Sequence, residues 1–212
     1  MKDLLKRFPS LSSLAKFFYL RFVQLGARSK FSKLDSLDQI KLELGSGQKK
    51  GKDGWVTVDL HGADINWDLR RGLPLRDGSV DVIYSSHLLE HIPIDAQVPF
   101  LQECLRVLKP GGTFSIAVPN SRYYIDAYLE ERMFRERESW WQPGLVDTGS
   151  FIDQVNYIAY MRDEHKCLFD PVSLLNTLKK AGFANAESRS FDDSVDLQGR
   201  DFESCYAMAV KR

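Results

Sequence analysis

The sequence predicts an α/β fold with a mostly parallel sheet, and three observations support that prediction. Short apolar runs of strand length recur along the chain and are separated by helical patterns. The run at residues 40–44 leads directly into a turn with two glycines, residues 45–47. The next run, residues 55–60, carries an acid, Asp59, near its end. In open α/β sheets the carboxyl ends of the strands line the crevice that binds ligands, so we expect the site there.

The turn Gly45-Ser46-Gly47 suits the close approach of a ligand to the main chain. Glycine has no Cβ and takes positive φ at little cost, and exposed backbone N–H groups at such a turn can hold a carboxylate or a hydroxyl. The pattern departs from the dinucleotide fingerprint, because Lys50 stands where a third glycine would be. The missing third glycine argues against a pyrophosphate ligand and for a single nucleoside, whose ribose diol Asp59 is placed to hold.

Two further segments complete the pattern. Residues 77–87 read as a turn, an apolar strand and a polar tip, and residues 105–119 read as a helix end, a Pro-Gly-Gly turn and another strand. Over residues 40–183 the chain resembles class I S-adenosylmethionine-dependent methyltransferases, most of all the small type associated with surface-glycan synthesis. The resemblance implies a seven-stranded Rossmann-like sheet, mostly parallel, with an antiparallel final hairpin and a helical N-terminal arm.

The resemblance also implies S-adenosyl-L-methionine as the cofactor. Glu43 would orient its amino end, Asp59 would hold the ribose, and Asp68 would accept the adenine amine beside Leu69. The alternative for Asp68 is a cap on the turn before residues 70–72, and for His87 it is a structural role. The full set of cofactor-binding residues implied is Glu43, Gly45, Ser46, Gly47, Asp59, Leu60, Asp68, Leu69, Ser85 and His87.

The acceptor chemistry is predicted from the strand tip at residues 85–87 and from two histidines. The tip lacks the Asn-Pro-Pro-Tyr pattern of nucleobase enzymes and the acids of metal-dependent catechol enzymes. We therefore expect O-methylation of a sugar, glycan or small molecule, with His91 or His165 as catalytic base; each could equally be a structural residue. His87 and His91 lie four apart, but no third ligand is evident near them, so no metal site is expected.

Composition bounds the organisation of the chain. The 212 residues are 43% hydrophobic with zero net charge, which suits one domain and gives no field to recruit nucleic acid. Cys104, Cys167 and Cys205 are far apart, as in a reducing cytoplasm. We expect a basic amphipathic helical arm at residues 1–38 and a methyltransferase domain at residues 39–212, with an acceptor-site insertion at about residues 120–167.

The arm is strongly basic. Residues 1–34 hold eight Lys or Arg against Asp3, with apolar residues at helical spacing. Such helices can cover the sheet and turn their charges to water, or lie on the inner face of a membrane. The longest early apolar run is too short to span a bilayer, and no cleavable signal peptide is evident.

The remaining elements follow in order. We expect a helix at residues 94–108, a strand at 114–118, a charged helix running to Glu138, a helix from Pro171 to Ala181, and two strands at 184–190 and 205–210 joined by a solvated acidic loop. The aromatic residues of the insertion would stack on the acceptor or pack a helical cap onto the core.

Two functions from different classes remain open on the sequence alone. One is the methyltransferase. The other is a catalytically silent module of the same fold that binds cofactor, a partner or a membrane. The intact set of acid and glycines favours the enzyme. A nucleotide-sugar or dinucleotide enzyme is disfavoured by the missing third glycine.

Overall fold

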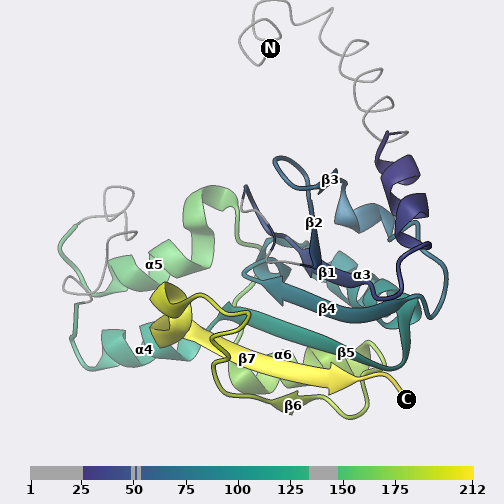
Figure 1. Ribbon diagram of the computed structural model, residues 1–212. Helices are drawn as coiled ribbons and strands as arrows, with labels where there is room; N and C mark the ends of the chain where they lie inside the picture. Colours follow the sequence, from purple (N-terminus) through teal and green to yellow (C-terminus); the bar gives the residue numbers. More distant parts are fainter. Residues whose placement is uncertain (1–25, 49–50, 52–53, 134–147) are drawn as a thin grey trace, which may run out of the picture.

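A seven-stranded sheet with the order β3-β2-β1-β4-β5-β7-β6 forms the centre of the protein. The computed structural model describes residues 26–48, 51, 54–133 and 148–212. Neighbouring strands from β3 to β5 run parallel, whereas β7 runs antiparallel to both β5 and β6 (Figure 1). This confirms the predicted fold class and its antiparallel finish. The strands are β1 (Lys41–Leu44), β2 (Trp55–Asp59), β3 (Ile65–Asn66), β4 (Val80–Ser86), β5 (Leu108–Pro119), β6 (Glu187–Ser188) and β7 (Ser204–Val210).

The strand order reverses at β1, which lies between β2 and β4. Leu42 of β1 aligns with Val56 of β2 on one side and with Ile83 of β4 on the other. The connections from β1 therefore diverge at its carboxyl end, which is the topological switch point where α/β sheets bind ligands. The described residues between β1 and β2, residues 45–48, 51 and 54, are not helical, as their short span predicts.

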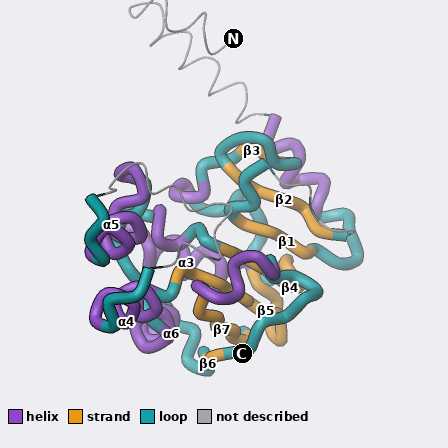
Figure 2. The backbone as a smooth tube through the Cα atoms, turned by 90° about the vertical axis from the view of Figure 1, so that its left-hand side faces the viewer, coloured by secondary structure: helices purple, strands orange, loops and turns teal. Residues whose placement is uncertain are grey.

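Alternate residues along the central strands are apolar, and their side chains fill one face of the sheet. Leu42, Ile83 and Phe114 are fully buried there, and Phe114 stacks on Phe183 with ring centroids 5.1 Å apart. The helices α3 (Ile94–Val107) and α6 (Pro171–Lys180) contact each other beside this core. The tube of Figure 2 shows the sheet edge-on with the helices α4 and α5 gathered to one side.

The helix boundaries follow predicted capping signals. Asp170 and Ser173 form a reciprocal capping box at the start of α6, with Pro171 in its first turn. Gly182 follows the helix with a φ of +107°. After α3, β5 begins at once with Leu108, and residues 109–112 form an irregularity in the pairing with β4 rather than a separate turn.

The expected charged helix to Glu138 is wrong. The helix α4 (Ser121–Leu129) stops well before that point, and Glu131 just beyond it has a φ of +53°, which no α-helix accommodates. A second helix, α5 (Ile152–Tyr160), packs beside α4. Residues 134–147, which include Trp140 and Trp141, lie outside the described residues.

Two described tyrosines of this segment pack together in a small second core. Tyr124 and Tyr157 are buried with Ala127 and Ile158 between α4 and α5. This arrangement favours the cap-packing interpretation over acceptor stacking for these two side chains. Tyr160, by contrast, is 63% exposed.

The acidic loop between β6 and β7 is not simply solvated. Asp196 is buried, and its carboxylate accepts hydrogen bonds from Tyr84 of β4 and Arg189. This network covers the face of the sheet opposite α3 and α6, because Tyr84 and Ser115 alternate with the core residues Ile83 and Phe114. The loop also contains the short helix η5 (Gln198–Glu203).

Part of the N-terminal arm packs on the domain. Residues 26–34 are helical, and Ala27, Phe31 and Leu34 on one face are buried. Phe31 meets Trp67 edge-to-face at 5.7 Å, while Arg28, Lys30 and Lys33 face water. The covering interpretation therefore fits these nine residues; residues 1–25 lie outside the described part of the chain. None of the described helices is long and apolar enough to cross a bilayer.

Candidate functional site

The turn after β1 is closely packed at its first glycine. Gly45 has a φ of +76°, and its N–H donates to the Val58 carbonyl at 2.8 Å. A Cβ at Gly45 would lie 2.7 Å from the Cβ of Leu88, so the loop after β4 occupies the space that a side chain would need. Gly47, with a φ of +63°, has no atom within 4 Å of its would-be Cβ. The absence of a side chain at Gly45 thus makes room for Leu88, and the absence of one at Gly47 leaves the main chain there accessible.

Asp59 at the end of β2 is tied to that turn. The backbone N–H of Gly47 donates to its Oδ2 at 2.9 Å. This single bond leaves the other carboxylate oxygen available and fixes the carboxylate beside the exposed main chain. Two residues predicted to bind one cofactor are therefore joined in the structure.

A cavity of about 170 Å³ lies beside these residues. Its lining includes four of the predicted cofactor residues, Asp59, Leu60, Asp68 and Leu69. The predicted base His91 also lines it. The complete lining is Asp59, Leu60, Trp67, Asp68, Leu69, Arg70, Leu88, His91 and Ile92.

Asp68 lines the cavity and also caps the helix η1 (Leu69–Arg71). Its carboxylate accepts from the backbone N–H of Arg70 at 3.1 Å and from the guanidinium at 2.8 Å on each oxygen. These bonds to Arg70 lower the pKa of Asp68. The capping interpretation is therefore correct, and an adenine amine would have to share an oxygen that Arg70 already contacts.

Several predicted residues lie off the cavity wall. His87 has a φ of +51°, and its Nε2 lies 2.8 Å from Ser204 Oγ on β7, as the structural interpretation expects. Ser85 is fully buried, and its hydroxyl has no partner among the described residues. Ser46 is buried in the turn, and Glu43 is half-buried on β1. Cofactor contacts by these four residues stay predictions.

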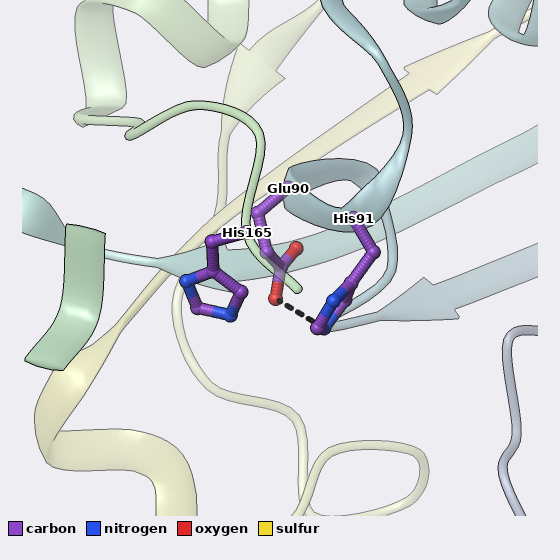
Figure 3. Close-up of side chains that lie close together, drawn as sticks. All are labelled: Glu90, His91 and His165. Atoms are coloured by element: carbon purple, nitrogen blue, oxygen red, sulfur yellow. Dashed lines mark ion pairs between the residues drawn. The ribbon is translucent and has the colours of Figure 1, made fainter. Parts of the chain in front are cut away.

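The two predicted bases, His91 and His165, meet in space although 74 positions separate them in the sequence. Their ring centroids are 4.7 Å apart, in edge-to-face contact. Glu90, from the helix η2 (Leu89–His91), lies between them, with its Oε1 3.9 Å from His91 Nε2 (Figure 3). The Lys166 N–H donates to the Glu90 carbonyl at 2.7 Å and holds the two segments together.

Burial dominates the protonation of this cluster. It raises the pKa of Glu90 to about 8 and lowers that of His165 to about 4. Burial also lowers the pKa of His91, despite the neighbouring Glu164 carbonyl. His165 Nδ1 lies 2.6 Å from the Ile158 carbonyl, so this nitrogen carries the proton and Nε2 keeps its lone pair.

Sequence reasoning missed Glu90, Leu88 and Trp67. An acid inside the apolar run of residues 88–92 is a signal that could have drawn attention to Glu90, because buried acids are rare without a partner or a function. Leu88 and Trp67 carried no signal beyond an ordinary core pattern.

The comparisons with known proteins agree with this geometry. Residues 24–116 match the family model for a methyltransferase domain. The match covers less than half of the chain.

A curated relative is similar to this chain over a short stretch. A protein of Mycolicibacterium smegmatis described as a "Probable S-adenosylmethionine-dependent methyltransferase" is 47% identical over 57 residues, which are 25% of this chain. The chain spans about a fifth of that relative, since the match covers 21% of its length.

Solved structures support the fold. The S-adenosylmethionine-dependent methyltransferase of Archaeoglobus fulgidus aligns with a TM-score of 0.51 and 16% identity, covering 90% of this chain and 94% of that one. Another, from Thermotoga maritima, covers all of both chains at 17% identity with a TM-score of 0.48, a similarity too loose to bear on function.

The two turn glycines should respond differently to alanine. Gly45→Ala should lower the free energy of unfolding by about 2–3 kcal/mol, because the new methyl group overlaps Leu88 and φ is positive. Gly47→Ala should cost only about 1 kcal/mol, from φ alone, and should instead weaken cofactor binding by filling the open main chain. Urea unfolding and binding calorimetry measure the two effects; equal losses of stability in both variants would contradict this division.

Proposed function

We propose that the protein transfers a methyl group from S-adenosylmethionine to an oxygen of a sugar, glycan or small molecule. The observation that carries the proposal is the position of Asp59. Its carboxylate is held by the Gly47 N–H beside a cavity that His91 also lines. A ribose anchor and a proton acceptor thus border the same space.

Bound S-adenosylmethionine supplies an activated methyl group, so the protein needs to align the reactants and exclude water. Asp59 would accept hydrogen bonds from the ribose hydroxyls, and the Gly47 main chain would allow the cofactor to lie close. Leu69 and Leu88 give the cavity apolar surface for the adenine ring. His91 borders both the cavity and the buried cluster, where it would meet the acceptor hydroxyl.

Binding calorimetry with purified protein tests the cofactor step. We expect S-adenosylmethionine to bind at micromolar concentration, and no heat of binding at millimolar cofactor would refute the proposal. Transfer of a labelled methyl group to a panel of sugars, glycans and small hydroxylated compounds then separates an active enzyme from a silent cofactor-binding module.

The histidines should affect turnover rather than cofactor binding. We expect His91→Ala and His165→Ala each to lower kcat by about tenfold to 100-fold, within the range of general-base contributions. The dissociation constant for S-adenosylmethionine should change less than threefold, since the ribose and adenine contacts lie elsewhere. The exposed His61 provides the control variant His61→Ala. Wild-type turnover in both cluster variants would remove histidine base catalysis.

The glycan acceptor rests on the resemblance in sequence to the small methyltransferases of surface-glycan synthesis. A membrane-borne glycan would also give the basic residues of the arm a role at an anionic lipid surface. Sedimentation with phosphatidylglycerol vesicles, compared with phosphatidylcholine vesicles, tests that role. Equal recovery of the protein with the two kinds of vesicle would show that the arm has no role at an anionic lipid surface.

A further inference from the structure

The buried carboxylate of Glu90 is the least satisfied polar group in the described part of the chain. The residue is 1% exposed, and neither oxygen accepts a hydrogen bond from the described residues. Its contacts with His87 Nδ1 and His91 Nε2 are both 3.9 Å, beyond hydrogen-bond distance. A buried polar group without a partner costs about 1–3 kcal/mol, and more when it is charged. A ligand bound to this carboxylate would offset that cost.

Two imidazole nitrogens converge on the same point. One ligand atom each from Glu90, His91 and His165 lie within 4.8 Å of one another. Figure 3 shows the three side chains turned toward a common space between the two histidine rings. Two histidines and one carboxylate are a donor set that divalent first-row transition ions favour.

The surroundings orient His165 as metal ligands are oriented. His165 Nδ1 donates to the Ile158 carbonyl at 2.6 Å, so its Nε2 presents a lone pair to the cluster. Metal-bound histidines almost always donate their other ring N–H to a carbonyl or carboxylate, which fixes the tautomer and the ring direction.

Hydrogen bonds to backbone carbonyls hold the three residues in place. Gln97 is buried and donates to the carbonyls of Leu89 and Ile92, which brace the turn that carries Glu90 and His91. The Lys166 N–H donates to the Glu90 carbonyl and anchors the neighbouring His165. The fold thus holds the segments that carry Glu90, His91 and His165 next to one another.

From this geometry we propose that Glu90, His91 and His165 bind one divalent first-row transition ion, with zinc as the representative. Zinc bonds of about 2.0–2.2 Å would bring the ligand atoms to roughly 3.3 Å from one another. The His91 to Glu90 separation of 3.9 Å is near that value. Three protein ligands leave a fourth position open, the pattern of catalytic zinc.

The ion would lie next to the cavity, because His91 lines that cavity and is the most exposed of the three. A role in catalysis rests on the proposed function; with the ion bound, His91 and His165 would act as metal ligands in place of the general base. An acceptor hydroxyl bound to the ion would lose its proton to water. Its oxygen would then form a bond to the methyl carbon as the carbon–sulfur bond breaks, and the electron pair would stay on sulfur.

The test uses the full chain stripped of metal, with zinc alone as the probe and a chromophoric chelator as competitor. We expect one equivalent to bind, with affinity at least 100-fold weaker in Glu90→Gln and His165→Gln. The control His61→Gln, at an exposed histidine, should bind as the wild type does. Cobalt substitution should give visible absorption bands in the wild type that Glu90→Gln lacks.

Stability distinguishes a lost ligand from a lost fold. Glu90→Gln replaces a buried carboxyl group that accepts no hydrogen bond with an amide of the same size, so the metal-free variant should melt near the wild-type temperature. Zinc should raise the Tm of the wild type and leave that of Glu90→Gln unchanged. Zinc binding that is absent in the wild type, or equal in Glu90→Gln and the wild type, would overturn the metal site.

Cofactor binding is measured separately on the metal-free chain. If zinc fails to bind while S-adenosylmethionine binds and methyl transfer proceeds, the metal site is wrong and the proposed function stands. If zinc binds while S-adenosylmethionine does not, the proposed function is wrong and the metal site stands.

Discussion

Asp59→Ala should weaken S-adenosylmethionine binding by roughly 100-fold or more while the chain stays folded. Each hydrogen bond from a ribose hydroxyl to a carboxylate contributes about 1.5–3 kcal/mol, and 1.4 kcal/mol corresponds to a tenfold change in affinity. The variant also loses the bond from the Gly47 N–H to Oδ2, which orders the turn. Binding calorimetry gives the affinity, and thermal melting without cofactor gives the stability.

Two further variants make the Asp59 result specific. Asp59→Asn keeps an oxygen that can accept from Gly47, so its loss of affinity should be smaller than that of Asp59→Ala. Asp38→Ala removes an exposed acid just before the amino end of β1, away from the cavity, and should leave affinity unchanged. Wild-type affinity in Asp59→Ala would show that the ribose is held elsewhere.

Local sequence patterns predicted the elements that carry the proposed cofactor site. The alternating run of β1, the glycine turn and the acid closing β2 all lie within residues 40–59. Each is decided by backbone conformation and side-chain periodicity over a few positions. The bond between Gly47 and Asp59 then follows from the parallel pairing of β1 and β2.

Contacts between distant segments could not be predicted in the same way. The sequence offered His91 and His165 as separate candidates, and nothing local indicated that they meet with Glu90 between them. The expectation of no metal site considered only ligands near His87 and His91 in the sequence, whereas the proposed site takes one ligand from residue 165. The fold supplies the other histidine from residue 165 and turns His87 toward Ser204.

Helix length was another quantity that local pattern misjudged. The charged, helix-favouring composition continues beyond residue 130, yet Glu131 takes a positive φ and the chain turns. Helical propensity is a weak influence that tertiary packing overrides. Tyr124 of α4 packs against α5. The length of α4 therefore depends on contacts with a helix from a different part of the sequence.

Asp196→Ala should lower the free energy of unfolding by about 3–5 kcal/mol, because it leaves a buried guanidinium without its carboxylate. Arg189 is 11% exposed at its side chain, and Asp196 is 1% exposed. Their bonds are 2.5 and 2.8 Å, and Tyr84 adds a third to the same carboxylate at 2.9 Å. Urea unfolding followed by circular dichroism measures the loss.

The matched control lies on the same loop, where Asp193 is exposed. Asp193→Ala should change stability by no more than about 0.5 kcal/mol, as exposed substitutions usually do. The double variant Arg189→Met with Asp196→Leu should recover most of the loss, because it removes both buried charges and keeps apolar volume. If Asp196→Ala costs less than about 1 kcal/mol, the ion pair does not anchor the final hairpin to β4. The acidic loop would then be the solvated connection that its composition suggests.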